Sequence, residues 1–236
     1  MESHNVKQPT PVDAPAPPMI PEPTLPTPPS SRHVDVVTCP DRASAFRVEG
    51  EVDGEVRIDH TGSTLSVEDL EENDGVSFHV RIYAPGVTTI AVSGSTSLRV
   101  LDLCGGRLRV TSSGSSSIEI MGRLDTLELD SSGSTALDLT DVKTRELDID
   151  TSGSTSVRAR GDAERIDIDT SGSSSVDAFG MKAEHVRVDS SGSAAIRVCV
   201  TGSLSANMSG SGDVVYDCAP ADISHDISGS GSVRAR

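Results

Sequence analysis

The sequence predicts an all-β protein, a single-stranded β-helix or β-solenoid with coils of about 19–20 residues. Three observations support this. A Ser-Gly-Ser triplet recurs, the runs between triplets alternate apolar and polar residues, and aromatic residues make up only 2% of the chain. Successive glycines of the triplets are 20, 19, 20, 19, 20, 18 and 19 residues apart. Such a period is typical of solenoids, whose thin cores form because each unit packs only on its neighbours. These glycines are Gly94, Gly114, Gly133, Gly153, Gly172, Gly192, Gly210 and Gly229.

Each repeat is predicted to hold two strands and two turns. Between Ser134 and Ser152, the alternating segments 136–139 and 146–150 are expected to be strands, separated by a turn. Glycine suits the turns because it adopts positive φ without a Cβ clash. A second glycine column lies half a repeat later, and Asp141 takes the place of glycine in one repeat. This second column consists of Gly122, Gly161, Gly180 and Gly202.

Alignment of the repeats places only aliphatic residues at the expected inward positions. A slip of one residue would turn a strand inside out, so four uniformly aliphatic columns support this register. The first strand supplies Ile118, Leu137, Val157, Val176 and Ile196, then Ile120, Leu139, Ala159, Ala178 and Val198. The second strand supplies Leu127, Leu147, Ile166 and Val186, then Leu129, Ile149, Ile168 and Val188.

The chain divides into three parts by composition. Residues 1–33 are proline-rich and are expected to form a disordered, semi-rigid tether, with docking to a proline-reading partner as the alternative. Residues 34–92 contain alternating runs and are expected to form a β entry region that caps the solenoid. Residues 93–236 carry the Ser-Gly-Ser repeats.

The net charge of −16 argues against two classes of partner. Binding to a nucleic acid backbone or to an anionic membrane surface requires clustered Lys and Arg, which the chain lacks. No apolar run reaches the roughly 18 residues of a membrane span. We therefore expect no nucleic acid binding and no membrane insertion.

The four cysteines do not have the spacing of a zinc site or a redox motif. Cys199 and Cys218 fall about one repeat apart, but their alignment is off by one residue. Because strand side chains alternate, this offset points the two thiols to opposite faces and disfavours a disulfide bond between them. The other two cysteines are Cys39 and Cys104.

Outward positions form two kinds of charge column. One has mixed signs, which allows neighbouring coils to pair. The other stacks aspartates just before the corner, beside a second acidic column that Arg187 interrupts. Each aspartate is expected to accept a hydrogen bond from the following turn. The less favoured alternative is a shared Ca²⁺ ion, with Asp130, Asp150, Asp169 and Asp189 as the candidate metal ligands. The mixed column is Glu119, Asp138, Arg158, Asp177 and Arg197, and the second acidic column is Glu128, Asp148 and Asp167.

No motif in the sequence indicates catalysis, and we expect no catalytic residue and no cofactor. The histidines do not form a zinc-binding HExxH pair or share a column with a nucleophile. Carboxylate pairs could serve a β-helix that cleaves polysaccharides, but such enzymes also need aromatic platforms, and aromatics are nearly absent. The histidines are His4, His33, His60, His79, His185 and His225.

Three features of the sequence resemble the pattern of one known family. They are the recurrent Ser-Gly-Ser, its extended forms at 209–213 and 228–232, and a strand ending at Pro85 followed by a strand that enters the first triplet. Over residues 45–236 this pattern resembles the putative auto-transporter adhesin, head GIN domain family of bacterial β-solenoids. The resemblance implies a right-handed β-helix-like fold, an envelope or extracellular location, and no known catalytic residues.

The sequence therefore predicts a non-enzymatic, adhesin-like structural module with a rigid acidic repeat surface for a protein or glycan partner. One alternative is an intracellular scaffold that polymerises, because no signal peptide is visible and the last strand, 232–236, ends without a cap. That alternative includes end-to-end self-association and a cytoplasmic location. A polysaccharide-acting enzyme is the least favoured alternative.

Overall fold

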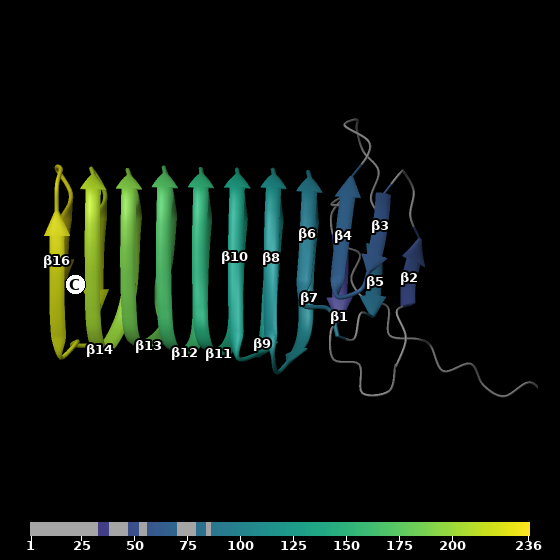
Figure 1. The fold of residues 1–236 in the computed structure, drawn as a ribbon, viewed down its shortest axis with the longest axis horizontal. Coiled ribbons are helices and arrows are strands. Elements are labelled where there is room, and N and C mark those ends of the chain that lie inside the picture. Colours follow the sequence, from purple (N-terminus) through teal and green to yellow (C-terminus); the bar gives the residue numbers. More distant parts are fainter. Residues whose placement is uncertain (1–32, 38–46, 52–55, 70–78, 84–85) are drawn as a thin grey trace, which may run out of the picture.

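A computed structural model describes residues 33–37, 47–51, 56–69, 79–83 and 86–236 (Figure 1). Except for His33, the predicted proline-rich tether therefore lies outside the described residues. The described residues contain strands and turns but no helix. The strands are β1 (His33–Val37), β2 (Arg47–Glu51), β3 (Val56–Thr61), β4 (Thr64–Asp69), β5 (His79–Tyr83), β6 (Thr89–Gly94), β7 (Ser97–Cys104), β8 (Arg107–Gly114), β9 (Ser117–Arg123), β10 (Thr126–Gly133), β11 (Ala136–Gly153), β12 (Ser156–Gly172), β13 (Ser175–Gly192), β14 (Ala195–Gly210), β15 (Asp213–Asp217), β16 (Asp222–Ile227) and β17 (Ser232–Ala235).

The strands stack in parallel as a β-solenoid of about eight turns, which confirms the predicted fold class. Each coil contributes one strand segment to each of two faces, and the coils follow one another along the rod in Figure 1. The first face contains β7, β9, the first parts of β11–β14, β15 and β17. The second face contains β6, β8, β10, the last parts of β11–β14 and β16.

The core between the two faces consists of the predicted aliphatic columns. Leu137 pairs in register with Ile118 on one side and Val157 on the other, and all three are buried. Leu147 and Ile166 continue the same arrangement on the second face, each with no exposed surface. Alternation thus places aliphatic side chains inside and charged ones outside, as the sequence predicts.

The Ser-Gly-Ser corners require glycine for two reasons. Gly172 has a φ of 128°, and a Cβ atom there would lie 2.6 Å from the carbonyl oxygen of Gly153. In the other corner column, Asp141 replaces glycine and keeps a positive φ of 52°. Aspartate tolerates this region better than most residues.

Some corner hydroxyls are buried, a feature that sequence analysis did not anticipate. The hydroxyl oxygens of Thr151 and Ser174 lie 3.1 Å apart, and the Thr170 hydroxyl donates to Ser190 Oγ at 3.0 Å. All four residues are buried. The corners therefore contain hydrogen-bonded hydroxyl pairs inside the coil, in addition to the exposed serines beside each glycine.

An N-terminal strand is inserted into the first face of the solenoid. β1 pairs in parallel with β5 on one side and with β7 on the other, although both follow it at a distance in sequence. Val34 and Val36 of β1 have no exposed surface and belong to the core. At the same end of the rod, β2 pairs antiparallel with β5 and β3 pairs antiparallel with β4. β6 then runs parallel to both β4 and β8.

The prediction against a disulfide between Cys199 and Cys218 is wrong. The structure joins these residues by a disulfide bond, with Cα atoms 5.1 Å apart. Cys199 pairs in register with Asp217, so Cys218 follows one residue after its expected partner. At Cys218 the φ angle is 72°, which ends the alternation of side chains along β15. Strand alternation does not set the direction of the Cys218 side chain, because Cys218 lies just beyond the end of β15.

Candidate functional site

The candidate site is a column of aspartates on the second face, just before the serine corner. Cross-strand register aligns Asp130, Asp150, Asp169 and Asp189 on β10, β11, β12 and β13, as the sequence predicts. Asn207 and then Asp226 continue the column. Adjacent strands are about 4.8 Å apart, so like charges lie within strong repulsion distance. We call the four aspartates the acidic column.

A second acidic column on the same face runs beside the first, through Glu128, Asp148 and Asp167, until Arg187 interrupts it. Crowding of carboxylates changes their titration. Partial burial raises the pKa of Asp148, and the neighbouring charges of Asp167 and Glu128 raise it further. Partial burial likewise raises the pKa of Asp150, with additional repulsion from Asp169 and Asp130. The carboxylates at the centre of this face therefore ionise at a higher pH than isolated aspartates do.

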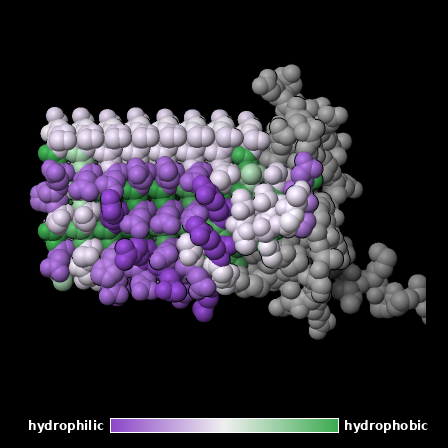
Figure 2. Space-filling view, in the orientation of Figure 1, coloured by the Kyte–Doolittle hydropathy of each residue, from purple (hydrophilic) through white to green (hydrophobic). Residues whose placement is uncertain are grey.

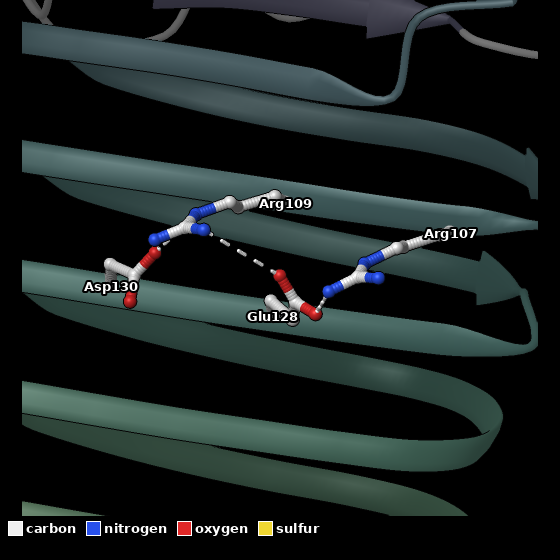
Figure 3. Close-up of polar contacts among 4 residues, drawn as sticks. All are labelled: Arg107, Arg109, Glu128 and Asp130. Carbon is white, nitrogen blue, oxygen red and sulfur yellow. Dashed lines mark hydrogen bonds and ion pairs between the residues drawn. The ribbon is translucent and has the colours of Figure 1, made fainter.

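Arginines compensate the end of the acidic face nearest the entry region (Figure 3). On β8, the guanidinium of Arg107 donates to Glu128 of β10. The Arg109 Nε donates to Asp130 Oδ2 at 2.7 Å, while its Nη1 lies 4.0 Å from Glu128 Oε2. These pairs anchor both acidic columns at their first carboxylate.

The other end of the acidic column has partners of its own. Asn207 Nδ2 donates to Asp189 at 2.8 Å, and Arg187 Nε donates to it at 2.7 Å. These bonds lower the pKa of Asp189, with the asparagine bond as the largest cause and burial opposing it. Within the part of the chain that the structure describes, no ion pair reaches Asp150 or Asp169. The middle of the column therefore lacks direct ion pairs, and in this sense we call it uncompensated, although the charges of Arg109 and Arg187 still act on Asp150 and Asp169 at longer range.

Shallow grooves lie on both sides of the acidic column. One, of about 640 Å³, runs along both acidic columns and is lined by carboxylates such as Asp148, Asp150 and Asp167 together with four arginines. Another, of about 520 Å³, lies between the column and corner serines that include Ser132 and Ser152. Figure 2 shows this side of the rod, with a pale row of corner residues along its edge and hydrophilic side chains below. The surface thus offers carboxylates and hydroxyls in a regular row.

The sequence predicts that each aspartate accepts a hydrogen bond from the following corner turn. Asp130 and Asp189 instead accept hydrogen bonds from arginine and asparagine side chains. The Ca²⁺ hypothesis stays a prediction. Among the described residues, no group of three or more His, Cys, Asp or Glu side chains converges as metal ligands do. Carboxylates in a row along a rod face solvent side by side and do not point at a common centre.

The first face carries the mixed-sign column that the sequence predicts. Cross-strand register aligns Asp138 with Arg158, and Arg158 with Asp177. Arg197 Nη1 lies 3.7 Å from Asp177 Oδ2. The ion pair to Asp138 comes from Arg160 at 3.9 Å and not from Arg158. Glu119 pairs with Arg99 of β7 at 2.9 Å, which extends the ladder by one coil.

Comparison with solved structures shows the same fold in bacterial proteins. A crystal structure of a putative adhesin from Parabacteroides distasonis superposes with a TM-score of 0.77 at 22% identity, covering 88% of this chain and 90% of that one. A putative adhesin from Parabacteroides merdae gives a TM-score of 0.73 at 20% identity, covering 88% and 89%. A second Parabacteroides distasonis structure, described as a putative lipid binding protein, gives 0.71 at 22% identity, covering 87% and 89%.

Sequence comparison adds one match. The family model described as putative auto-transporter adhesin, head GIN domain, matches residues 31–220. No curated protein is significantly similar to the chain. In the described residues, no helix has the length and apolar character needed to cross a membrane.

Proposed function

Because the chain belongs to the putative auto-transporter adhesin, head GIN domain family, we propose that it is a non-catalytic, adhesin-like module of the cell envelope. In this proposal the rod presents its acidic second face to a partner that carries cationic groups, either a protein or a surface glycan. The observation that carries it is the uncompensated pair Asp150 and Asp169, held in register on adjacent strands.

Electrostatics supports a cationic partner. Partial burial is the largest cause of the raised pKa of Asp148 and Asp150, and repulsion from carboxylates on the neighbouring coils adds to it. A cation placed over the groove would relieve that repulsion, so part of the binding free energy comes from strain that the free protein already holds. Because the coils are rigidly stacked, the partner meets charges at a fixed spacing, and its own spacing then becomes a source of specificity.

A binding experiment with matched variants tests this. The full chain is immobilised and its binding to a lysine-rich peptide is measured by interferometry at low and high salt. D150N/D169N removes two charges from the acidic column. D138N/D177N removes two from the mixed column and serves as the control. The proposal expects salt-sensitive binding that only D150N/D169N weakens severalfold. Equal weakening by both variants, or no binding to the cationic probe, would contradict it.

The absence of catalysis is part of the same proposal. The acidic grooves are shallow and open, and the residues that line the largest of them are charged or aliphatic, with no aromatic platform among them. We expect no turnover when the full chain is incubated with polysaccharides. Release of reducing ends above the level of a heat-denatured sample would instead support the enzymatic alternative.

An envelope or extracellular location is proposed on two grounds. The family is named for adhesion, and the Cys199–Cys218 disulfide is of a kind that persists in oxidising compartments. Fractionation of the native cell, with thiol alkylation before lysis, tests both grounds together. An envelope or external protein with the bond intact is expected. A cytosolic protein with free thiols would favour the intracellular scaffold.

End-to-end self-association stays a prediction. Ile223 of β16 is 42% exposed, which leaves an apolar side chain on a terminal strand of the described rod. Light scattering over a range of protein concentrations distinguishes the two cases. A mass that rises with concentration, and rises less in I223D, would support association, whereas a constant mass would dismiss it.

A further inference from the structure

A cluster of side-chain contacts holds the last coil of the rod, two of them to the coils before it and one within the coil itself. The disulfide joins Cys199 of β14 to Cys218, which follows β15. Arg236 Nη1 lies 3.1 Å from Asp217 Oδ2, and the same guanidinium lies 5.2 Å from the centre of the Phe179 ring. These contacts connect residues that are far apart in sequence, and the disulfide is the only covalent one of the three.

The backbone of this coil is unfavourable without such a constraint. Cys218 and the next residue, Ala219, have φ angles of 72° and 53°. Residues with a Cβ atom rarely adopt this region, and each instance costs about 1–3 kcal/mol. The Cys218 amide donates to Asp217 Oδ1 at 2.7 Å, which offsets part of that cost. The remainder must come from contacts that hold Cys218 in place, and the disulfide acts on that residue directly.

The last coil buries less of its surface than the coils before it. Val214 is buried in β15, and Tyr216, Ile227 and Val233 are partly buried against the core, but every residue of β16 from Asp222 to Asp226 is exposed. In β13, by contrast, buried residues recur along the whole strand. Segments with few buried contacts open at low free energy without global unfolding. Loss of the disulfide is therefore expected to release this coil and leave the rod intact.

We propose that Cys199–Cys218 is a thiol–disulfide exchange site that locks the terminal coil, residues 213–236. Oxidation closes the coil on the rod, and reduction by a dithiol releases it. The partner chemistry is that of a small dithiol or a dithiol oxidoreductase. Reduction turns the last coil into a free segment and leaves β14 as the end of the ordered rod.

The exchange follows from the exposure of the two sulfur-bearing residues. Cys218 is exposed, whereas Cys199 retains 5% of its surface, so an external thiolate reaches the Cys218 sulfur first. Attack forms a mixed disulfide at Cys218 and breaks the bond to Cys199, which leaves as a thiolate and takes up a proton. The second thiolate of the dithiol then attacks the dithiol's first sulfur, which is bonded to Cys218 in the mixed disulfide, and Cys218 is released as a thiolate. The protein disulfide gains two electrons, and the dithiol ends as a disulfide.

Hydrogen exchange followed by mass spectrometry tests the lock in the full chain. Amides of residues 213–235 are compared before and after dithiothreitol, and again after reoxidation. A disulfide that closes a loop of this length stabilises by enough that its loss should speed local exchange about a hundredfold. Amides of 136–192 should be unchanged, and reoxidation should restore protection. Unchanged exchange at the terminal coil, or equal acceleration along the rod, would overturn the proposal.

Two variants keep the test decisive. C39S/C104S leaves Cys199 and Cys218 as the only targets of the reductant and should respond as the natural chain does. C199S/C218S should show fast terminal exchange without reductant and no further change when dithiothreitol is added. A C199S/C218S chain whose terminal coil remains as protected as the oxidised natural chain would also overturn the proposal.

Discussion

The two faces of the rod share one strand spacing but carry opposite charge arrangements. On the first face, Asp177 meets Arg158 on one side and Arg197 on the other. On the second face, Asp150 meets Asp130 and Asp169, and none of its neighbours in the column is basic. The same backbone register therefore stabilises charge on one face and strains it on the other. Repulsion within a column opposes folding, so this column is not explained by stability and is the better candidate for contact with a partner.

The corners hold both faces in register, so the most disruptive change is at a corner. Gly172→Ala would require φ of 128° with a Cβ atom, placed 2.6 Å from the Gly153 carbonyl oxygen. We expect a loss of about 3 kcal/mol in the free energy of unfolding. Urea denaturation followed by circular dichroism measures it. Exposed Ser173→Ala in the same corner is the control and should change stability by less than about 0.5 kcal/mol. Similar stability in both variants would show that the corner does not set the register.

Two single substitutions, one on each face, compare how a negative charge affects stability on the two faces. Asp150→Asn and Asp177→Asn each remove one negative charge from a central coil. The first relieves repulsion and is expected to stabilise the chain by about 0.5 kcal/mol, whereas the second removes a favourable neighbour and is expected to destabilise it by about 0.3 kcal/mol. Chemical denaturation at neutral pH and low salt checks the two signs. Equal effects of the two variants would mean that only net charge matters, which would remove the distinction between the faces.

The pH dependence of stability should differ between the middle and the far end of the second face in a defined direction. Burial and like charges raise the pKa of Asp148 and Asp150 above the ordinary 3.8. Between 3.8 and the raised values the folded chain binds more protons than the unfolded chain, so their contribution to stability falls as pH rises through that window. Asp189 behaves oppositely, because its lowered pKa contributes stability above 3.8 that is lost as pH falls further.

Urea unfolding of D148N/D150N and of the natural chain measures how much Asp148 and Asp150, whose pKa values are raised, contribute to the free energy of unfolding. The variant should be the more stable at neutral pH, and its advantage should shrink as pH falls toward 3.8, where the natural carboxyls become protonated. An advantage that stays constant with pH would indicate a packing effect and not a titration.

The repeat made most of this architecture predictable. Successive coils show the same alternation many times, so Leu147 and Ile166 could be assigned to the core and Asp150 and Asp169 to one column from spacing alone. Single-copy features have no such support. The position of β1 between β5 and β7 is one of these, because a five-residue strand carries no sign of its partners. The turn at Cys218 is another, since its positive φ depends on tertiary contacts and reverses the expected side-chain direction.

The sequence also does not show which side chains within a predicted column form ion pairs. Register alone pairs Asp138 with Arg158, yet the ion pair comes from Arg160. A long arginine side chain reaches diagonal neighbours as easily as direct ones. Likewise, the sequence places Thr111, which is not acidic, before Asp130 in the column. The sequence does not show that the Arg109 side chain reaches Asp130 on the neighbouring strand.

The smallest expected effect concerns this arginine, which sets where the uncompensated stretch begins. Arg109→Gln removes the bond to Asp130 and the weaker contact with Glu128. Both partners are partly exposed, so the loss in stability should be about 0.3 kcal/mol and should vanish in about 1 M salt. Arg145→Gln is the control, because its pair with Glu164 lies outside both acidic columns.

Removing Arg109 also leaves Asp130 without an ion pair, and so extends the uncompensated part of the acidic column by one coil. Binding of the lysine-rich peptide should therefore strengthen in Arg109→Gln but not in Arg145→Gln, although each variant gains the same net negative charge. Equal strengthening in both would assign the binding to overall charge and not to the second face.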